Sequence, residues 1–131
     1  MPHMWVEYSL NIQSEAEITS INQALYDAII KAKIFPVAGI RIRKTAIEDY
    51  VVGDGRPENS FVHVVLRMGA GRDEATQHAA AQEIFEAIKR HLQPLSDRRP
   101  LAVAFEVQEM HPKLNFKFNN LRRHMAQEGA K

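Results

Sequence analysis

Two segments with helical spacing, each between two segments of β-type sequence, constrain the fold of this chain most strongly. Downstream of Ser14, apolar residues recur every three or four positions, which predicts a helix ending near Lys33, before Pro36. Asp73 can cap a second helix. The apolar positions of the two helices are Ile18, Ile21, Leu25, Ile29 and Ile30, then Ala79, Ala80, Ile84, Phe85, Ile88 and Leu92. Each pattern predicts one buried helical face.

The segments around these helices are typical of strands. Four strands are predicted over His3–Leu10, Val37–Lys44, Phe61–Met68 and Leu101–Val107, with a short fifth over Ile47–Val52. The segment Leu101–Val107 is almost wholly apolar, as expected for an inner strand. Turn residues Gly53–Pro57 follow the short strand, and Pro94 and Pro100 are expected to bracket a loop. The tail from His111 has no clear periodicity.

This order predicts an α+β domain with two β-α-β units, a mixed sheet and two helices on one face. We expect one domain over residues 1–131, with halves at about 2–60 and 61–120 that share a pattern rather than a sequence, and a C-terminal tail at 121–131. Such a sheet has a second face left to bury. Oligomerisation is therefore a reasonable expectation for a core of this size.

Charge and composition exclude several classes of function. The 131 residues include 17 Lys and Arg against 16 Asp and Glu, so no overall charge favours nucleic acid or an anionic membrane. The chain has no cysteine, which excludes disulfides and thiolate chemistry. No apolar run reaches membrane-spanning length, and the N-terminus lacks the pattern of a signal peptide. We expect a cytoplasmic protein that needs no membrane partner.

Pro2 is the first candidate for chemistry. Aminopeptidases remove Met1 before a small residue, and proline qualifies, so we expect a free secondary amine at the start of a strand. Such an amine titrates near neutrality, and burial and nearby cations lower its pKa further. A neutral amine is a competent general base. A second residue with no special role is the competing interpretation, and a retained Met1 would make Pro2 an amide without basicity.

Arg41 and Arg72 are the second candidates. Arg41 follows Gly39-Ile40 on a predicted strand, and Arg72 follows Gly69-Ala70-Gly71 at a strand-to-helix turn. Guanidinium groups bind carboxylates bidentately, so two of them beside a base suit a polycarboxylate. The alternative is two surface arginines. The glycine turn lacks the Gly-Lys-Ser/Thr of a phosphate-binding loop, which disfavours a nucleotide.

Other polar residues give weaker indications. The six histidines form no metal-ligand pattern. His63, within a predicted strand, is expected to be a hydrogen-bonded histidine of the core or behind the site rather than a metal ligand. Serines lack the nucleophile-elbow pattern of hydrolases. Glu106 and Glu109 fit a solvated strand end. Phe116 and Phe118, on either side of Lys117, suggest an apolar anchor that packs on the domain itself or on a neighbouring subunit.

Several blocks together resemble the 5-carboxymethyl-2-hydroxymuconate isomerase family of the tautomerase superfamily. They occur in the family's order and cover residues 2 to about 120. The blocks are Pro2-His3-Met4-Trp5-Val6-Glu7, Phe35-Pro36-Val37-Ala38-Gly39-Ile40-Arg41, Phe61-Val62-His63, Gly69-Ala70-Gly71-Arg72 and the run from Phe105 to Lys117. The stretch 45–60 and the end after Asn120 match less well.

The resemblance implies a homotrimeric enzyme, with no cofactor or metal, that acts in homoprotocatechuate degradation. It places the catalytic proline on Pro2 and the two catalytic arginines on Arg41 and Arg72, with Phe35 and His3 as further substrate-binding residues. Pro2 would move a proton within 5-carboxymethyl-2-hydroxymuconate or a similar unsaturated 2-hydroxy polycarboxylate, while the arginines hold carboxylates and stabilise the dienolate.

Two alternatives stay open at this stage. One is another reaction of the same superfamily, such as hydration, dehalogenation or decarboxylation; a hydratase would need a carboxylate such as Glu7 or Glu106 to activate water. The other is a trimeric binding module without catalysis, as in proteins similar to macrophage migration inhibitory factor.

Overall fold

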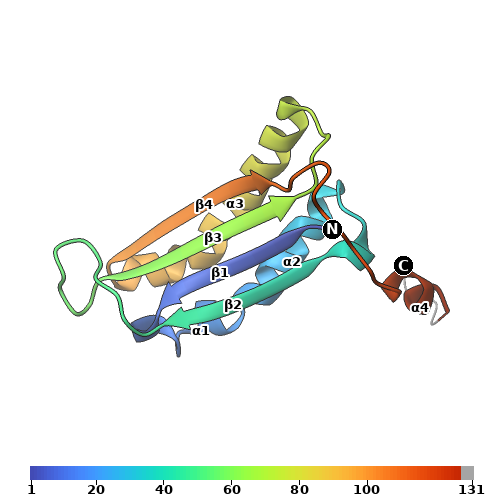
Figure 1. Ribbon diagram of the computed structural model, residues 1–131. Helices are drawn as coiled ribbons and strands as arrows, with labels where there is room; N and C mark the ends of the chain where they lie inside the picture. The colour runs from blue at the N-terminus through green and yellow to red at the C-terminus, as the bar shows by residue number, and fades with distance from the viewer. Residues whose placement is uncertain (128–131) are drawn as a thin grey trace.

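Four strands form one sheet, and the long helices cover one of its faces (Figure 1). The computed structural model describes residues 1–127; residues 128–131 of the predicted tail lie outside the described part. The strands are β1 (His3–Ser9), β2 (Arg41–Ile47), β3 (Ser60–Met68) and β4 (Leu101–Glu109). The helices are α1 (Ala16–Thr19), α2 (Ile21–Ala32), α3 (Glu74–Arg98) and α4 (Leu121–Gln127), with 3-10 turns η1 (Leu10–Ile12) and η2 (Val37–Gly39).

The sheet is mixed, with the strand order β2-β1-β3-β4. β1 runs parallel to β2 and antiparallel to β3, and β3 runs parallel to β4. His3 on β1 is therefore level with Arg41 on β2 and with Arg67 on β3. The predicted α+β class and mixed sheet are confirmed.

The core lies between the sheet and the helices α2 and α3. β1 alternates, so that Met4, Val6 and Tyr8 are buried against the helices. On the helices, the periodic apolar residues predicted to form a buried face are indeed buried against the sheet. They include Ile21, Leu25, Ile29, Ile84, Ile88 and Leu92. Each fully buried aliphatic side chain contributes about 1.5–3 kcal/mol to stability, so this layer fixes the sheet on the helices.

The opposite face of the sheet carries the alternate residues of each strand. On β1 these are His3, Trp5 and Glu7. Within residues 1–127, no helix lies over this open face (Figure 1). The open face is thus available to a second molecule.

The first half departs from the predicted boundaries at three points. The predicted helix from Ser14 is divided at Ser20 into α1 and α2. The strand predicted from Val37 begins only at Arg41, because a 3-10 turn closed by bonds from Gly39 N to Pro36 O and from Ile40 N to Val37 O comes first. The short strand over residues 47–52 is wrong: the chain leaves the sheet edge after Ile47, and Val51 is 84% exposed.

Two predictions in the second half are also wrong. Pro94 does not open a loop; α3 continues through it to Arg98, because buried Leu92 and Leu95 hold this turn against the core. The segment from Leu101 is the edge strand β4 rather than an inner one. Its apolar run conceals an alternation, since Ala102 and Ala104 are exposed on the open face.

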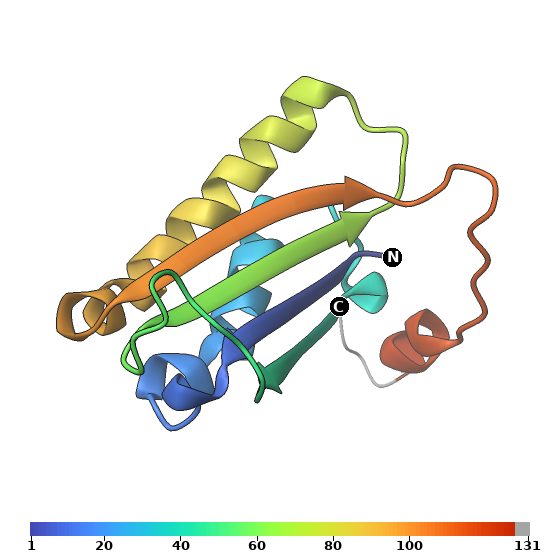
Figure 2. The same ribbon diagram turned by 60° about the vertical axis from the view of Figure 1, so that its left-hand side comes forward.

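The predicted tail contains an extended arm and a helix. After β4 the chain turns at His111, whose Nδ1 accepts bonds from the N–H groups of Lys113 and Leu114 at 3.0 and 2.8 Å. The arm then leads to α4, on the side of the molecule where the chain begins (Figure 2). There α4 contacts η2. Aperiodic residues of the tail thus reach the N-terminal region.

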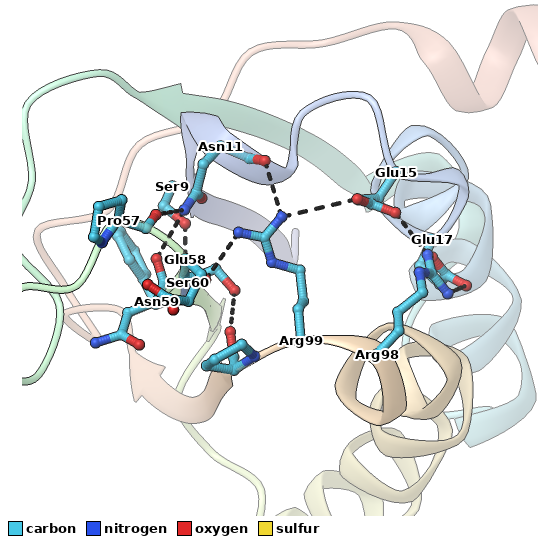
Figure 3. A network of polar contacts seen from close by, with 12 residues as sticks. Ser9, Asn11, Glu15, Glu17, Pro57, Glu58, Asn59, Ser60, Arg98 and Arg99 are labelled. Carbon is cyan, nitrogen blue, oxygen red and sulfur yellow. Dashed lines mark hydrogen bonds and ion pairs between the residues drawn. The ribbon is translucent and has the colours of Figure 1, made fainter.

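At the far end of the sheet, a polar network joins segments that are distant in sequence (Figure 3). Arg99 donates to the carbonyl oxygens of Asn11 at 3.3 Å and Glu58 at 2.9 Å. Asn11 donates in turn to the carbonyl oxygen of Asn59 at 2.8 Å, and Arg98 pairs with Glu15 at 2.7 Å and with Glu17. These bonds tie the end of α3 to the two loops that face it.

Among the described helices, none is long and apolar enough to cross a membrane.

Candidate active site

The N-terminal end of β1 is packed tightly against the turn η2. Pro2 is buried, and its carbonyl oxygen accepts a 3.0 Å hydrogen bond from the N–H of Arg41. A Cβ placed on Gly39 would lie 3.1 Å from Met1 Cα and 3.2 Å from Pro2 Cδ. Any larger side chain at this position would push the first two residues away by a few tenths of an ångström or more. Gly39 was not predicted from the sequence to belong to the site.

Arg41 and Arg72 approach this region from the two halves of the chain. Nη1 of Arg41 donates to the carbonyl oxygens of Ala38 and Ile40, both at 3.0 Å. Arg72, between β3 and α3, donates to the carbonyl oxygens of Ile34 at 2.7 Å and Gly69 at 3.4 Å. These bonds hold both guanidinium groups in defined orientations, which preorganises them for an anion.

Phe35 adds a further contact that orients Arg72. The guanidinium carbon of Arg72 lies 5.0 Å from the centre of the Phe35 ring, within the range of a cation–π contact. The cap of α3 fixes the other side of this turn: Asp73 accepts a 2.7 Å bond from the N–H of Thr76, as predicted. Arg41 bonds directly to Pro2, and both Arg41 and Arg72 lie close enough to the N-terminal amine for their charges to act on it.

The electrostatic setting favours a neutral amine at the chain's N-terminus. Burial has the largest effect on the pKa of the Met1 amine, and the positive charges of Lys117, Arg72 and Arg41 add to it; all four lower that pKa. An amine at this position therefore loses its proton at lower pH than an ordinary N-terminus, as a general base working near neutrality requires.

A cavity of about 130 Å³ opens beside this amine. One wall is Met1, Pro36, Ala38 and Gly39, and the other is Lys117, Asn119 and Arg122 from the arm and α4. Among the described residues that line it, neither Arg41 nor Arg72 appears; Arg41 is hydrogen-bonded to Ala38 of the first wall, and Arg72 to Ile34 and Gly69 outside the lining. The sequence did not predict Lys117, Asn119 and Arg122 here, because nothing in an aperiodic tail indicates where it returns.

His3 lies apart from the other predicted substrate-binding residues. The alternation of β1 points it to the open face, where it lines a second cavity of about 350 Å³ with Trp5, Arg43 and Arg67. The positively charged form of the ring is disfavoured there: burial first, then the charges of Arg43, Arg41, the N-terminal amine and Arg67, lower the pKa of His3. His3 Nδ1 lies 3.1 Å from Nη1 of Arg43, which suits a neutral ring accepting a bond.

The carboxylates considered for water activation lie elsewhere in the protomer. Glu7 is five residues from Pro2 along β1, about 16 Å in an extended strand. Glu106 pairs with His63 at 3.1 Å on the open face. No group of three His, Asp or Glu side chains within residues 1–127 is arranged to hold a metal ion. The geometry favours an amine base with cationic anchors.

Comparisons with known proteins agree on one family. A family model described as 5-carboxymethyl-2-hydroxymuconate isomerase matches residues 2–125. A curated relative, 5-carboxymethyl-2-hydroxymuconate Delta-isomerase of Escherichia coli, is 40% identical over 121 residues, which cover 92% of this chain and 96% of the relative.

Solved structures extend this likeness to the fold. A 5-carboxymethyl-2-hydroxymuconate delta-isomerase superposes with a TM-score of 0.87 at 27% identity, covering 95% of this chain and 93% of its own. A 5-carboxymethyl-2-hydroxymuconate isomerase from Deinococcus radiodurans R1 gives 0.86 at 30% identity, covering 94% and 92%. A fused 4-OT symmetric trimer, at 19% identity and a TM-score of 0.66 over 88% and 93%, shares the fold alone.

Proposed function

The chain belongs to the 5-carboxymethyl-2-hydroxymuconate isomerase family and is an isomerase, and on that premise we propose that its substrate is 5-carboxymethyl-2-hydroxymuconate or a similar unsaturated 2-hydroxy polycarboxylate, with Pro2 as the general base. The observation that carries this proposal is that the buried N-terminus lies near positively charged side chains from both halves of the chain, Arg41 from the first and Arg72 and Lys117 from the second. Such a substrate belongs to aromatic catabolism, on the homoprotocatechuate branch.

The reaction is a proton relocation that this chain's own groups can perform. After loss of Met1, the neutral Pro2 amine takes a proton from the 2-hydroxyl group or an adjacent carbon and returns it further along the conjugated system. Arg41 and Arg72 hold carboxylates and stabilise the negative charge that spreads over the dienolate. Phe35 keeps Arg72 oriented through the cation–π contact. His3, as a further substrate-binding residue, would act from the separate cavity on the open face.

The working form is a homotrimer. The open face of the sheet has no helical cover among the described residues, and the arm presents Phe116 and Phe118 at 87% and 103% exposure. Packing of these surfaces on further copies would remove a large apolar area from water. Some proteins that share this fold, such as the fused 4-OT proteins, are symmetric trimers.

The test compares wild type with Pro2→Ala in the ketonisation of 2-hydroxymuconate and the isomerisation of 5-carboxymethyl-2-hydroxymuconate. Loss of the prolyl base is expected to lower kcat by about 10²-fold or more. Intact mass must first establish that both proteins have lost Met1, because a retained methionine makes Pro2 an amide. Equal rates for two correctly processed proteins would contradict the proposal.

A further inference from the structure

We propose that Lys117 and Arg122 bind an additional carboxylate of the substrate, beyond those held by Arg41 and Arg72, and so select tricarboxylates over dicarboxylates. This inference rests on the proposed function and assigns a new role to the C-terminal arm. It starts from the cavity beside the N-terminus, where both residues face Gly39 and Met1 from the opposite wall.

The substrate's charge leaves one carboxylate without an assigned partner. 5-Carboxymethyl-2-hydroxymuconate carries three carboxylates, one on the carboxymethyl branch, whereas 2-hydroxymuconate carries two. Arg41 and Arg72 each suit one carboxylate, and both are already bonded to backbone carbonyl groups. A third carboxylate needs another cation near the reacting atoms.

The cavity supplies suitable donors for that group. Within residues 1–127, neither Lys117 nor Arg122 takes part in a salt bridge or a side-chain hydrogen bond. Lys117 provides a compact ammonium and Arg122 a planar guanidinium, which binds carboxylates bidentately. Asn119 uses Oδ1 to accept from the N–H of Leu121 at 3.2 Å, so its amide N–H groups stay available as donors.

Backbone contacts of the arm fix the position of these residues. The N–H of Met110 donates a 2.7 Å bond to Met68 at the end of β3, the turn at His111 follows, and α4 contacts η2. Lys117 lines the cavity, whereas Phe116 and Phe118 do not, although all three residues are exposed in one protomer. Among the charges that lower the pKa of the Met1 amine, Lys117 has the largest effect, which agrees with its place in the same cavity lining as Met1.

The experiment measures kcat/KM of wild type, Lys117→Met and Arg122→Gln for 5-carboxymethyl-2-hydroxymuconate and for 2-hydroxymuconate. Each variant is expected to lose about tenfold to a hundredfold with the tricarboxylate, mainly through KM, and about threefold or less with the dicarboxylate. Lys113→Met and Arg123→Gln are matched controls, because these residues belong to the same arm and helix but do not line the cavity. Lys117→Arg should restore most of the selectivity.

Four results would overturn the assignment, and each is distinguishable. Equal losses with both substrates, or no loss with either, would contradict it while leaving the proposed function intact. A change of oligomeric state in light scattering, with an unchanged substrate ratio, would mean that the two cations pair with a second copy. A wild-type enzyme that turns over neither substrate would contradict the proposed function itself, and with it the role of both cations.

Discussion

The N–H of Arg41 donates a 3.0 Å hydrogen bond to the carbonyl oxygen of Pro2, so the proposed base and an anion-binding arginine are joined at the start of the β1–β2 ladder. The parallel register sets this relationship, because His3 and Arg41 are level. Any change that moves the first residues away from η2 therefore displaces the amine from the arginine.

Gly39→Ala tests this packing. In the active enzyme, which has lost Met1, the new Cβ would still stand 3.2 Å from Pro2 Cδ, closer than most Cβ contacts, so Pro2 must shift by a few tenths of an ångström. We expect kcat to fall by about tenfold or more while the melting temperature changes little, because catalysis depends on sub-ångström placement. Gly69→Ala is the matched control, since its Cβ would meet nothing within 4 Å. Equal kinetics for the two variants would contradict the role of this contact.

Arg72→Ala is expected to lower kcat/KM by about 10²–10³-fold, the usual cost of losing one preorganised donor to a developing anion. Arg72→Lys should recover little, because an ammonium does not stack on Phe35 or bind bidentately. Steady-state kinetics together with a melting curve distinguishes a loss of substrate binding from a loss of folded protein. Arg90→Ala, at an exposed position of α3, is the control. If KM and kcat both stay unchanged in Arg72→Ala, the arginine does not hold the substrate.

The rate should depend on pH through the N-terminal amine. The neutral amine is the base, so kcat/KM falls as pH drops through its pKa. Burial and the charges of Lys117, Arg72 and Arg41 lower the pKa of the amine at Met1, and we expect the same charges to act on the Pro2 amine that loss of Met1 exposes. Removing one positive charge, as in Lys117→Met, therefore raises the pKa and moves the acid limb of the profile to higher pH. A pH–rate profile that does not move, or moves equally in Lys113→Met, would argue against this electrostatic coupling.

Arg99→Ala should affect stability without affecting chemistry. Its guanidinium bonds to the backbone of Asn11 and Glu58 (Figure 3). Asn11 follows the C-terminal end of β1, whereas Pro2 precedes its N-terminal end. Losing bonds to a charged donor costs about 1–3 kcal/mol in the free energy of unfolding. Urea unfolding measures this loss, and kcat/KM at a temperature where the variant is folded should match wild type. A large fall in activity would show that this end of the sheet communicates with the site.

Sequence periodicity predicted the parts of the fold that local physics determines. The spacing of Ile21, Leu25 and Ile29 marks a buried helical face, and Asp73 caps its helix as an aspartate before a helix should. Pro94 misled the prediction because the rule that proline breaks helices is local, whereas Leu92 and Leu95 stabilise that turn through the core. The predicted site residues Pro2 and Arg41 are joined directly, but their likeness to a family, not their spacing, pointed to them.

Contacts between distant segments could not be predicted in the same way. Lys117 and Arg122 reach the N-terminus only because the arm turns at His111 and returns past η2, and no periodic pattern accompanies that path. Gly39 was equally hidden, since a glycine required by a neighbour 37 or 38 residues earlier in the chain resembles any turn glycine. The space around a site depends on tertiary packing, which a single sequence does not encode locally.

Phe116 and Phe118 provide the last prediction, which concerns assembly. Both rings are nearly or fully exposed in one protomer, a costly arrangement unless a further copy covers them. Phe116→Asp combined with Phe118→Asp should therefore shift the proposed trimer toward monomers, because the carboxylates would be buried without partners.

Val51→Asp is the control for this change, since Val51 is 84% exposed and lies in the loop after β2, at the other end of that strand from the arm's helix α4. Light scattering coupled to size exclusion gives the mass of each variant. We expect the double variant also to lose activity, because the arm that carries Lys117 into the cavity would lose its support on the neighbouring copy. A double variant with the mass and the activity of wild type would mean that the arm does not hold the assembly together.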